Sequence, residues 1–314
     1  MAPLIRSLRA RSLILLVLIP MLILAACGST GGGGGGTPTT KGPITVGGKK
    51  DTEAQLLTEM YTQLLRHGGF TVNEKLAFGN TPFNFQAIKN GDIDLYPEFT
   101  ATGLNLLNIP SAHDPQKDYD AVKNGYEQQF KITWLDRAPL NDGYAICTSK
   151  SESQKLGIST ISDLASKVSQ LILESPSDGV PFVDNLKPVY NFDTKSFKKT
   201  ETVDYAVGFT AVANNQAQVN VCYTTDGSVA TQNFIFLQDD KHGFPEFNPA
   251  PIVRDTVLSK YPEIKTILNP LAPFLTTDVS IMLQQQVADK AKSESKTQAI
   301  KEVATDFLKS KGLL

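Results

Sequence analysis

Hydrophobic and polar residues change their spacing several times between residues 44 and 100, and each change predicts a new element. Ile44-Thr45-Val46 alternates and ends in a Gly-Gly turn, as a short strand does. From Thr52 apolar residues recur at helical spacing until His67. The predicted elements are strands at 44–46, 70–72 and 93–95 and helices at 52–67 and 81–90. Strands that alternate with helices of this length predict an α/β fold with a mainly parallel sheet.

A second α/β region begins at Tyr144 and is followed by a helical C-terminal third. The pattern predicts strands at 144–148 and 171–173 with a helix at 161–168 between them. It predicts C-terminal helices at 257–268, 277–291 and 296–311.

Residues 85–100 align without a gap with residues 209–224. Each copy predicts a helix, a polar turn and a strand, followed by an aromatic residue and threonine. Two lobes on one plan would bring these strand ends to a shared cleft, because ligands of open α/β sheets bind outside the carboxyl ends of strands. The repeat therefore predicts that Phe99 and Tyr223 face a cleft.

The first 26 residues have the features of an export signal. Three arginines precede an apolar run, Leu13–Ala26, and no acidic residue occurs in this stretch. The run is shorter than the roughly 20 residues that span a bilayer as a helix. Leu24-Ala25-Ala26-Cys27 resembles the lipobox of bacterial lipoproteins, in which the cysteine becomes the acylated N-terminus. We expect a signal peptide at 1–26 and a lipid on Cys27.

A glycine-rich stretch follows Cys27 and ends at Pro43, and such a composition is typical of a flexible linker. The folded part is therefore expected to begin near Ile44. Its roughly 270 residues exceed the usual size of a single core and favour two lobes.

Charge and cysteine content narrow the class of protein. Without residues 1–26 the chain keeps 27 Lys and Arg against 32 Asp and Glu, a formal net charge of −5, which argues against a nucleic-acid partner. Besides Cys27 there are only Cys147 and Cys222. Outside the cytoplasm these two could form a disulfide, or both could be buried thiols, and the sequence leaves the two alternatives open.

The sequence shows no catalytic or metal-binding motif. It has no G-x-S-x-G, H-E-x-x-H, C-x-x-C or P-loop pattern, and its three histidines are scattered through polar stretches. Asp92 and Asp94 alternate with apolar residues, so we interpret them as the solvated face of a strand and not as an acid–base pair. Nothing here requires an enzyme, a cofactor or a metal.

An ordered set of segments resembles the osmoprotectant-binding proteins of ABC importers, which bind glycine betaine, choline or carnitine with a type II periplasmic-binding fold. The segments include Ile44-Thr-Val-Gly-Gly-Lys49, Asp94-Leu-Tyr-Pro-Glu-Phe-Thr100, Tyr223-Thr-Thr-Asp-Gly227 and Phe247-Asn-Pro-Ala-Pro-Ile-Val-Arg254. They extend in order over nearly all of the chain after the linker.

The resemblance implies a set of binding residues. In that family a quaternary ammonium group lies among aromatic rings, and the matching positions are Phe99, Tyr144, Tyr223 and Phe247. A lysine and a threonine that hold the ligand's carboxylate match Lys49 and Thr102. The family's arginine has no counterpart in Ser175-Pro176-Ser177, and two rings lack the hydroxyl of tyrosine. These departures leave room for choline or for an altered ligand.

The sequence thus predicts a two-lobed lipoprotein that closes on a small quaternary amine and delivers it to an ABC permease. We expect lobe 1 at 44–142 and 250–314, lobe 2 at 143–249, and a hinge near Tyr144 and Ala250. The protein would be a monomer anchored to the outer face of the cytoplasmic membrane. The alternatives are the same fold binding another polar solute such as an amino acid, a lipid-anchored enzyme, and a scaffold that binds another protein.

Overall fold

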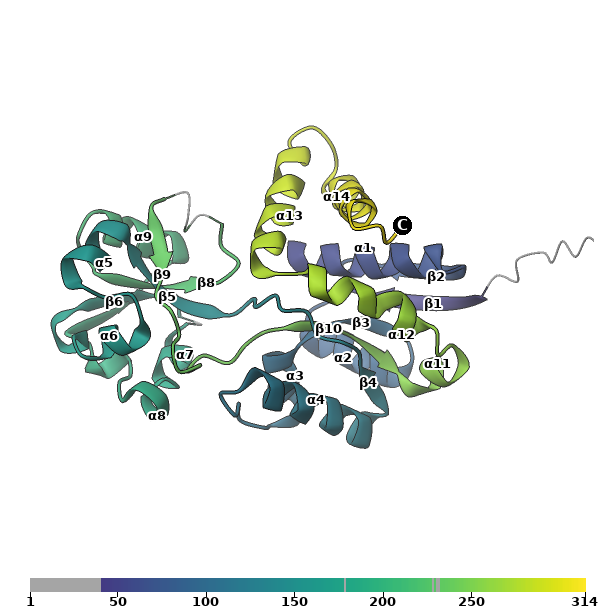
Figure 1. The fold of residues 1–314 in the computed structure, drawn as a ribbon, viewed down its shortest axis with the longest axis horizontal. Coiled ribbons are helices and arrows are strands. Elements are labelled where there is room, and N and C mark those ends of the chain that lie inside the picture. The colour runs from purple at the N-terminus through teal and green to yellow at the C-terminus, as the bar shows by residue number, and fades with distance from the viewer. Residues whose placement is uncertain (1–40, 178, 228, 230–231) are drawn as a thin grey trace, which may run out of the picture. The chain divides into compact units, whose positions relative to one another are not determined.

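The structure, a computed structural model, describes residues 41–177, 179–227, 229 and 232–314. The expected export signal, the lipidated Cys27 and most of the glycine-rich linker lie outside the described residues. Figure 1 shows the described helices and strands, which include two separate five-stranded sheets.

The first sheet has the strand order β2-β1-β3-β10-β4. Strand β10 runs antiparallel to both of its neighbours, whereas β1 is parallel to β2 and β3. The strands are β1 (Lys41–Gly47), β2 (Phe70–Lys75), β3 (Leu95–Phe99), β4 (Ile132–Trp134) and β10 (Pro249–Arg254). The helices that belong with them are α1 (Thr52–His67), α2 (Thr81–Asn90), α3 (Thr100–Leu107), α4 (Pro115–Phe130), α11 (Asp255–Lys260), α12 (Ile264–Leu268), α13 (Thr277–Lys290) and α14 (Lys296–Ser310).

The second sheet repeats this plan with the order β7-β6-β8-β5-β9. Strand β5 is its antiparallel member, and β6 is parallel to β7 and β8. The strands are β5 (Tyr144–Ser149), β6 (Ile172–Ser175), β7 (Lys199–Thr202), β8 (Val219–Tyr223) and β9 (Phe234–Phe236). The helices around it are α5 (Lys150–Leu156), α6 (Ile161–Ala165), α7 (Val180–Asp184), α8 (Lys187–Tyr190) and α9 (Tyr205–Ala213).

The internal repeat corresponds to equivalent parts of the two sheets. The first copy forms α2, a turn and β3, and the second forms α9, a turn and β8. Strands β3 and β8 are both the central strand of their sheet, and each ends on the predicted aromatic residue, Phe99 or Tyr223. The predicted order of helix, turn and strand is confirmed in each copy, but the strand expected at 93–95 begins only at Leu95 and runs to Phe99, because residues 91–94 form the turn after α2.

Local capping explains why several predicted helix bounds agree with the structure. Helix α1 begins after Asp51, whose carboxylate accepts the Ala54 N–H at 2.7 Å. Helix α2 begins after Asn80 with proline in its first turn and ends at Gly91, whose φ of 86° suits glycine.

Three further expectations about element bounds need correction. Strand β1 begins at Lys41 and not at Ile44, because the Lys41 N–H bonds to the Gly69 carbonyl at 3.1 Å and so extends the pairing with β2. The predicted helix at 257–268 is two helices, α11 and α12, separated at Tyr261-Pro262, where proline disfavours a continuous helix. Helix α6 ends at Ala165 and a 3₁₀ turn follows it.

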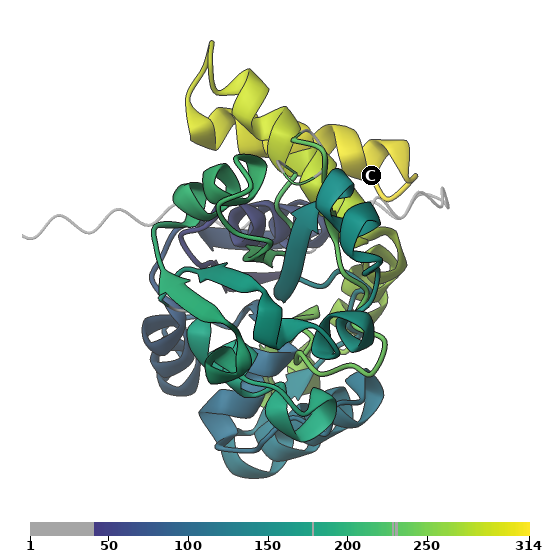
Figure 2. The ribbon, with the colours of Figure 1, turned by 90° about the vertical axis from the view of Figure 1, so that its left-hand side faces the viewer.

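Each sheet has its own apolar core. The buried clusters of the first sheet draw on residues 44–140 and 250–308, and those of the second sheet draw on residues 146–244. No apolar cluster among the described residues combines buried side chains from both sets. In Figure 2, α13 and α14 lie next to each other, and both belong to the core of the first sheet. The mixed α/β, two-lobed fold is therefore confirmed.

Two chain segments join the sheets, one before β5 and one before β10. They bond to each other: the Asp142 N–H donates to the Phe247 carbonyl at 3.1 Å, and the Phe247 N–H donates to Asn141 Oδ1 at 2.9 Å. Within the described chain no single helix is long and apolar enough to span a membrane. Two consecutive helical segments, 264–274 and 277–290, are together long and apolar enough, but the chain bends by 93° between them.

Candidate functional site

Tyr144 and Tyr223 form a pair at the edge of the second sheet. Tyr144 begins β5 and Tyr223 ends β8, and they face each other in the antiparallel register. Their ring centroids are 5.2 Å apart and both residues are half-buried. The Gly143 N–H donates to Thr224 Oγ1 at 2.8 Å, which attaches the first connecting segment to the end of β8.

A disulfide joins the two strands that carry these tyrosines. Cys147 of β5 and Cys222 of β8 are fully buried, with Cα atoms 6.0 Å apart. Of the two alternatives that the sequence left open, the structure has the disulfide. The bond holds β5 and β8 together one residue before Tyr223 and three residues after Tyr144.

Three more rings extend the tyrosine pair into a row. Phe182 of α7 stacks on Tyr144 with a centroid separation of 4.1 Å, and Phe247 lies 6.1 Å from Phe182. On the other side, Tyr205 lies 4.8 Å from Tyr223. The Tyr205 hydroxyl donates to Asp226 Oδ2 at 2.6 Å and accepts the Tyr223 N–H at 3.1 Å, so this ring is held in place by two bonds.

Phe99 lies apart from this row and is covered by Lys49. Its side chain is 5% exposed, and the Lys49 ammonium lies 4.8 Å from the centre of its ring. Lys49 Nζ also donates to Glu98 Oε1 at 2.5 Å. Glu98 is fully buried and accepts two further bonds, from the Tyr96 hydroxyl and from the Phe99 N–H, both at 2.8 Å. The Lys49 ammonium is thus already paired with a carboxylate of the protein itself.

Thr102 occupies the first turn of α3, directly after Phe99. It is half-buried, and the residue at the start of the helix, Phe99, provides no side-chain cap. Thr100 bonds instead to the second connecting segment, with its N–H to the Asn248 carbonyl at 3.0 Å. The start of α3 therefore lies beside the segment that carries Phe247.

The structure brings together some of the predicted site residues and leaves others apart. Tyr144 and Tyr223 are in direct ring contact, and Phe247 joins them through Phe182. Lys49 and Phe99 form a second group. Phe247 packs on the apolar cluster that contains Phe99, so it borders both groups.

Sequence analysis missed Phe182 and Tyr205. Phe182 follows Pro181 in the first turn of a five-residue helix. The proline indicates where the helix begins, but nothing in the sequence indicates which side chains the Phe182 ring contacts. Tyr205 lies four residues before the second copy of the repeat, which begins at Phe209, so the comparison of the two copies did not include it.

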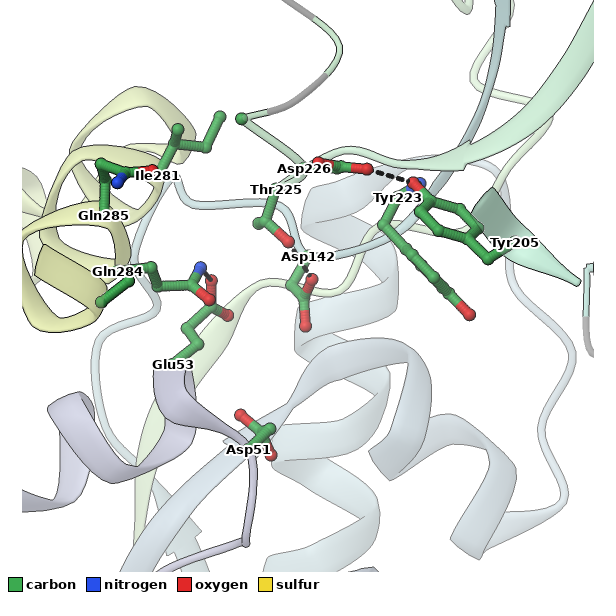
Figure 3. A pocket seen from close by; sticks show the side chains of 12 residues that line it. Asp51, Glu53, Asp142, Tyr205, Tyr223, Thr225, Asp226, Ile281, Gln284 and Gln285 are labelled. Atoms are coloured by element: carbon green, nitrogen blue, oxygen red, sulfur yellow. Dashed lines mark hydrogen bonds between the residues drawn. The ribbon is translucent and has the colours of Figure 1, made fainter. Parts of the chain in front are cut away.

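A cavity of about 690 Å³ lies beside Tyr205 and Tyr223 (Figure 3). Its wall combines residues from the start of α1, from α13, from the first connecting segment, from the start of α9 and from the end of β8 with the residues that follow it. The lining residues are Asp51, Glu53, Asp142, Tyr205, Tyr223, Thr225, Asp226, Gly227, Ile281, Gln284, Gln285 and Ala288. Four are carboxylates and none is Lys, Arg or His.

Two of these carboxylates are held in an unfavourable environment for a negative charge. Burial raises the pKa of Glu53 well above its usual value, and the nearby Asp142 raises it further, although the Ser280 hydroxyl bond opposes this. Burial also raises the pKa of Asp142, while its bond from Thr225 Oγ1, at 2.6 Å, acts in the opposite direction. The described residues contain no group of three His, Cys, Asp or Glu placed to hold a metal ion.

Asp92 and Asp94 lie in the turn before β3 and not on the strand, which corrects their interpretation as one solvated strand face. Asp92 is exposed, but Asp94 accepts the Thr45 N–H at 2.8 Å and lies 3.2 Å from Arg254. Asp94 therefore fastens β1 to the end of β10.

Comparison with known proteins gives a consistent result over almost the whole described chain. Residues 42–310 match the family model described as the substrate binding domain of ABC-type glycine betaine transport systems. The chain is 30% identical over 267 residues to the carnitine transport binding protein OpuCC of Listeria monocytogenes, covering 82% of this chain and 85% of that protein. It is 31% identical over 284 residues to the glycine betaine-binding protein YehZ of Escherichia coli, covering 86% and 91%.

A solved structure has the same fold. The crystal structure described as a glycine betaine/carnitine/choline ABC transporter superposes with a TM-score of 0.72 at 25% identity. The superposition covers 86% of this chain and 99% of that one.

Proposed function

This chain belongs to the family of substrate-binding domains of ABC-type glycine betaine transport systems, and we propose that it captures a quaternary amine among the rings of its two lobes. The family provides the extracytoplasmic, solute-binding component of ABC importers. The observation that carries the proposal is the row of aromatic rings around Tyr144 and Tyr223, at the point where the connecting segments meet the second sheet.

The chemistry of the ligand explains why rings are needed. A trimethylammonium group has no N–H to donate, so ring faces and apolar contact must hold it. Each ring contributes about 0.5–2 kcal/mol, with the larger value where water is excluded. We assign this role to Phe99, Tyr144, Tyr223 and Phe247, and add Phe182 and Tyr205 because their rings contact the tyrosine pair.

The two lobes, at 44–142 with 250–314 and at 143–249, would close on the ligand about the connecting segments. Residues 141–144 and 246–249 would serve as the hinge, and their mutual hydrogen bonds support this. Only a closed form would place rings of both lobes on one cation, so binding would shift the population toward it.

Lys49 and Thr102 would hold the polar end of the ligand. For Lys49 this role requires a change of partner, because its ammonium is bonded to Glu98 and covers Phe99. Thr102 would contribute its hydroxyl in the first turn of α3, whose N-terminus has no side-chain cap.

We further propose that the protein is not an enzyme and acts as a monomer anchored by a lipid on Cys27 to the outer face of the cytoplasmic membrane. A tether would keep the binding lobes at high effective concentration beside the permease. Mass spectrometry of the purified membrane fraction would test the lipid. An unmodified Cys27 in a mature chain would contradict the anchor.

Calorimetric titration with choline, glycine betaine and carnitine tests the binding proposal. We expect at least one of them to bind the parent protein, and Tyr223→Ala and Tyr144→Ala each to weaken binding by about 100-fold, since each loses a ring worth ~2 kcal/mol together with its neighbours' packing.

The matched control is Phe83→Ala, which removes an exposed ring on α2 outside the row. It should bind like the parent. Unchanged affinity in both tyrosine variants would disprove the aromatic site. Thermal stabilisation by amino acids, with no effect of any quaternary amine, would disprove the ligand class.

A further inference from the structure

A threonine follows the last residue of the central strand in each lobe. Thr100 comes directly after Phe99 of β3, and Thr224 comes directly after Tyr223 of β8. The two threonines occupy equivalent positions of the internal repeat. Each of them bonds to one of the segments that connect the lobes. The bonds have the same pattern in both lobes, although the sequences of the two segments differ.

In the first lobe, Thr100 makes three bonds to the second connecting segment. Its N–H donates to the Asn248 carbonyl at 3.0 Å, and its Oγ1 accepts the Asn248 N–H, also at 3.0 Å. The same hydroxyl donates to the Glu246 carbonyl at 2.6 Å. The hydroxyl is therefore acceptor and donor at once, and it holds the residues on both sides of Phe247.

In the second lobe, Thr224 bonds in the same way to the first connecting segment. Its N–H donates to the Gly143 carbonyl at 2.9 Å, and its Oγ1 accepts the Gly143 N–H at 2.8 Å. The hydroxyl donates to the Asn141 carbonyl at 2.6 Å, which is closer than its 3.2 Å contact with the Gly143 carbonyl. Tyr144 follows Gly143, so this threonine holds the segment directly before a ring.

The bonds have this form because the chain leaves the strand at each threonine. In an antiparallel ladder, two facing residues exchange a pair of N–H···O=C bonds. Thr100 begins α3 and Thr224 begins a turn, and in each case the side-chain hydroxyl accepts the return bond in place of the backbone carbonyl. A hydroxyl can donate and accept together, whereas valine has nearly the same shape and can do neither. Serine keeps both functions.

We propose that Thr100 and Thr224 are positioning residues for the ligand, each of which fixes two rings of the binding site to one connecting segment. Each of the four rings expected from the sequence lies beside one of these sets of bonds. The rings are Phe99 and Phe247 for Thr100, and Tyr223 and Tyr144 for Thr224. The inference rests on the function proposed above, because it concerns how these rings are held and not which amine they bind.

The two bonded segments also contact each other between the threonines. The Asp142 N–H donates to the Phe247 carbonyl, and the Phe247 N–H donates to Asn141 Oδ1. Hydrogen bonds thus extend from the end of β3 through both segments to the end of β8. Without the threonine hydroxyl, a ring on the segment is no longer fixed relative to the ring on the strand. Ligand binding must then restore that order, so affinity falls.

Calorimetry of valine and serine variants with choline, glycine betaine and carnitine tests this role. Thr224→Val and Thr100→Val should each weaken the binding of whichever amines bind the parent by about tenfold, the factor that losing a buried hydrogen bond produces. Thr224→Ser and Thr100→Ser should bind within about threefold of the parent, because serine keeps the donor and the acceptor.

The control is Thr148→Val, which removes the same hydroxyl from a fully buried position on β5. Thr148 Oγ1 donates to the Gln218 carbonyl at 2.7 Å, at the far end of β5 and β8 from the tyrosine pair. This variant should lose stability in urea denaturation but bind like the parent. Thr100 is buried and Thr224 is half-buried, so Thr224→Val still tests the proposal if Thr100→Val does not fold.

A double variant distinguishes positioning from a general effect on the fold. The hydroxyl of Thr224 would act by fixing Tyr144 relative to Tyr223. Thr224→Val combined with Tyr144→Ala should therefore bind about as weakly as Tyr144→Ala alone, because the ring to be positioned is already missing.

The outcomes separate this proposal from the binding function. Valine variants that bind like the parent, or serine variants that bind as weakly as valine, would overturn the positioning role and leave the binding function intact. A further loss of about tenfold in the double variant would do the same, since the two effects would then be independent. If none of the three amines binds the parent protein, the binding function fails and the positioning role fails with it.

Discussion

The two copies of the repeat end on equivalent aromatic residues but secure them differently. At the end of β3, the residue before Phe99 is Glu98, which is held by an ion pair with Lys49. At the end of β8, the equivalent residue before Tyr223 is Cys222, which is held by a disulfide to Cys147. Phe99 is buried under the lysine, whereas Tyr223 is half-buried and lines the large cavity.

The difference shows that residues at equivalent backbone positions of the two sheets can have different chemical surroundings. A disulfide leaves no charge at the strand end, so the face of Tyr223 is bordered by neighbouring rings and by the acidic cavity wall. An ion pair brings an ammonium onto the ring of Phe99 itself. A cationic ligand would therefore compete with the Lys49 ammonium at Phe99.

The largest expected effect comes from breaking the ion pair at the first strand end. Lys49→Met should lower the free energy of unfolding by about 3–5 kcal/mol, because Glu98 would keep a buried charge without its cation. Urea denaturation followed by circular dichroism measures this loss.

The double variant Lys49→Met with Glu98→Gln removes both charges and should recover most of the lost stability. A Lys49→Met variant as stable as the parent would show that the Lys49–Glu98 ion pair does not stabilise the end of β3.

Breaking the disulfide at the second strand end should have a smaller effect. Replacing Cys147 and Cys222 by alanine should lower the free energy of unfolding by about 2–4 kcal/mol, the usual effect of losing one cross-link. The two cysteines are 75 positions apart in the sequence. Reduction of the parent protein with dithiothreitol should reproduce the shift in the urea midpoint. A midpoint that changes in neither experiment would show that β5 and β8 hold their register without the bond.

The smallest effect is expected from Glu53, a buried carboxyl that forms no ion pair with any described residue, unlike Glu98. Its pKa in the folded protein is above the usual 4.5, so the folded state holds the proton more tightly than the unfolded chain. The contribution of Glu53 to stability is then complete below pH 4.5 and is lost as pH rises through the higher, folded value. Burial is the main cause of the raised pKa, Asp142 and Asp51 add to it, and the hydrogen bond from the Ser280 hydroxyl opposes it.

Glu53→Gln removes this loss, so it should raise the melting temperature at neutral pH. The gain over the parent should shrink as the pH is lowered and disappear below about pH 4.5. Asp278→Asn, at an exposed position on the neighbouring helix, should show no such pH-dependent gain. A gain that stays constant from pH 4 to 8 would argue against titration of Glu53 as its cause.

The sequence determined the elements that depend on short-range interactions. Helices α1 and α2 were predicted with their bounds because an Asx cap, an apolar face and a terminal glycine all lie within one helix length. The repeat predicted equivalent strand ends at Phe99 and Tyr223, because both copies use the same helix, turn and strand. The two-lobed fold followed from these units.

Only the tertiary structure decided which side chains meet at the strand ends. Lys49 and Glu98 are 49 positions apart, and Cys147 and Cys222 are 75 apart. The contact of Phe182 with Tyr144 and the approach of Glu53 to Ser280, 227 positions away, likewise depend on how the sheets and helices pack. Periodicity records which face of an element is buried, but it does not record the partner that this face contacts. For that reason the strand ends could be predicted, whereas the acidic cavity beside Tyr223 could not.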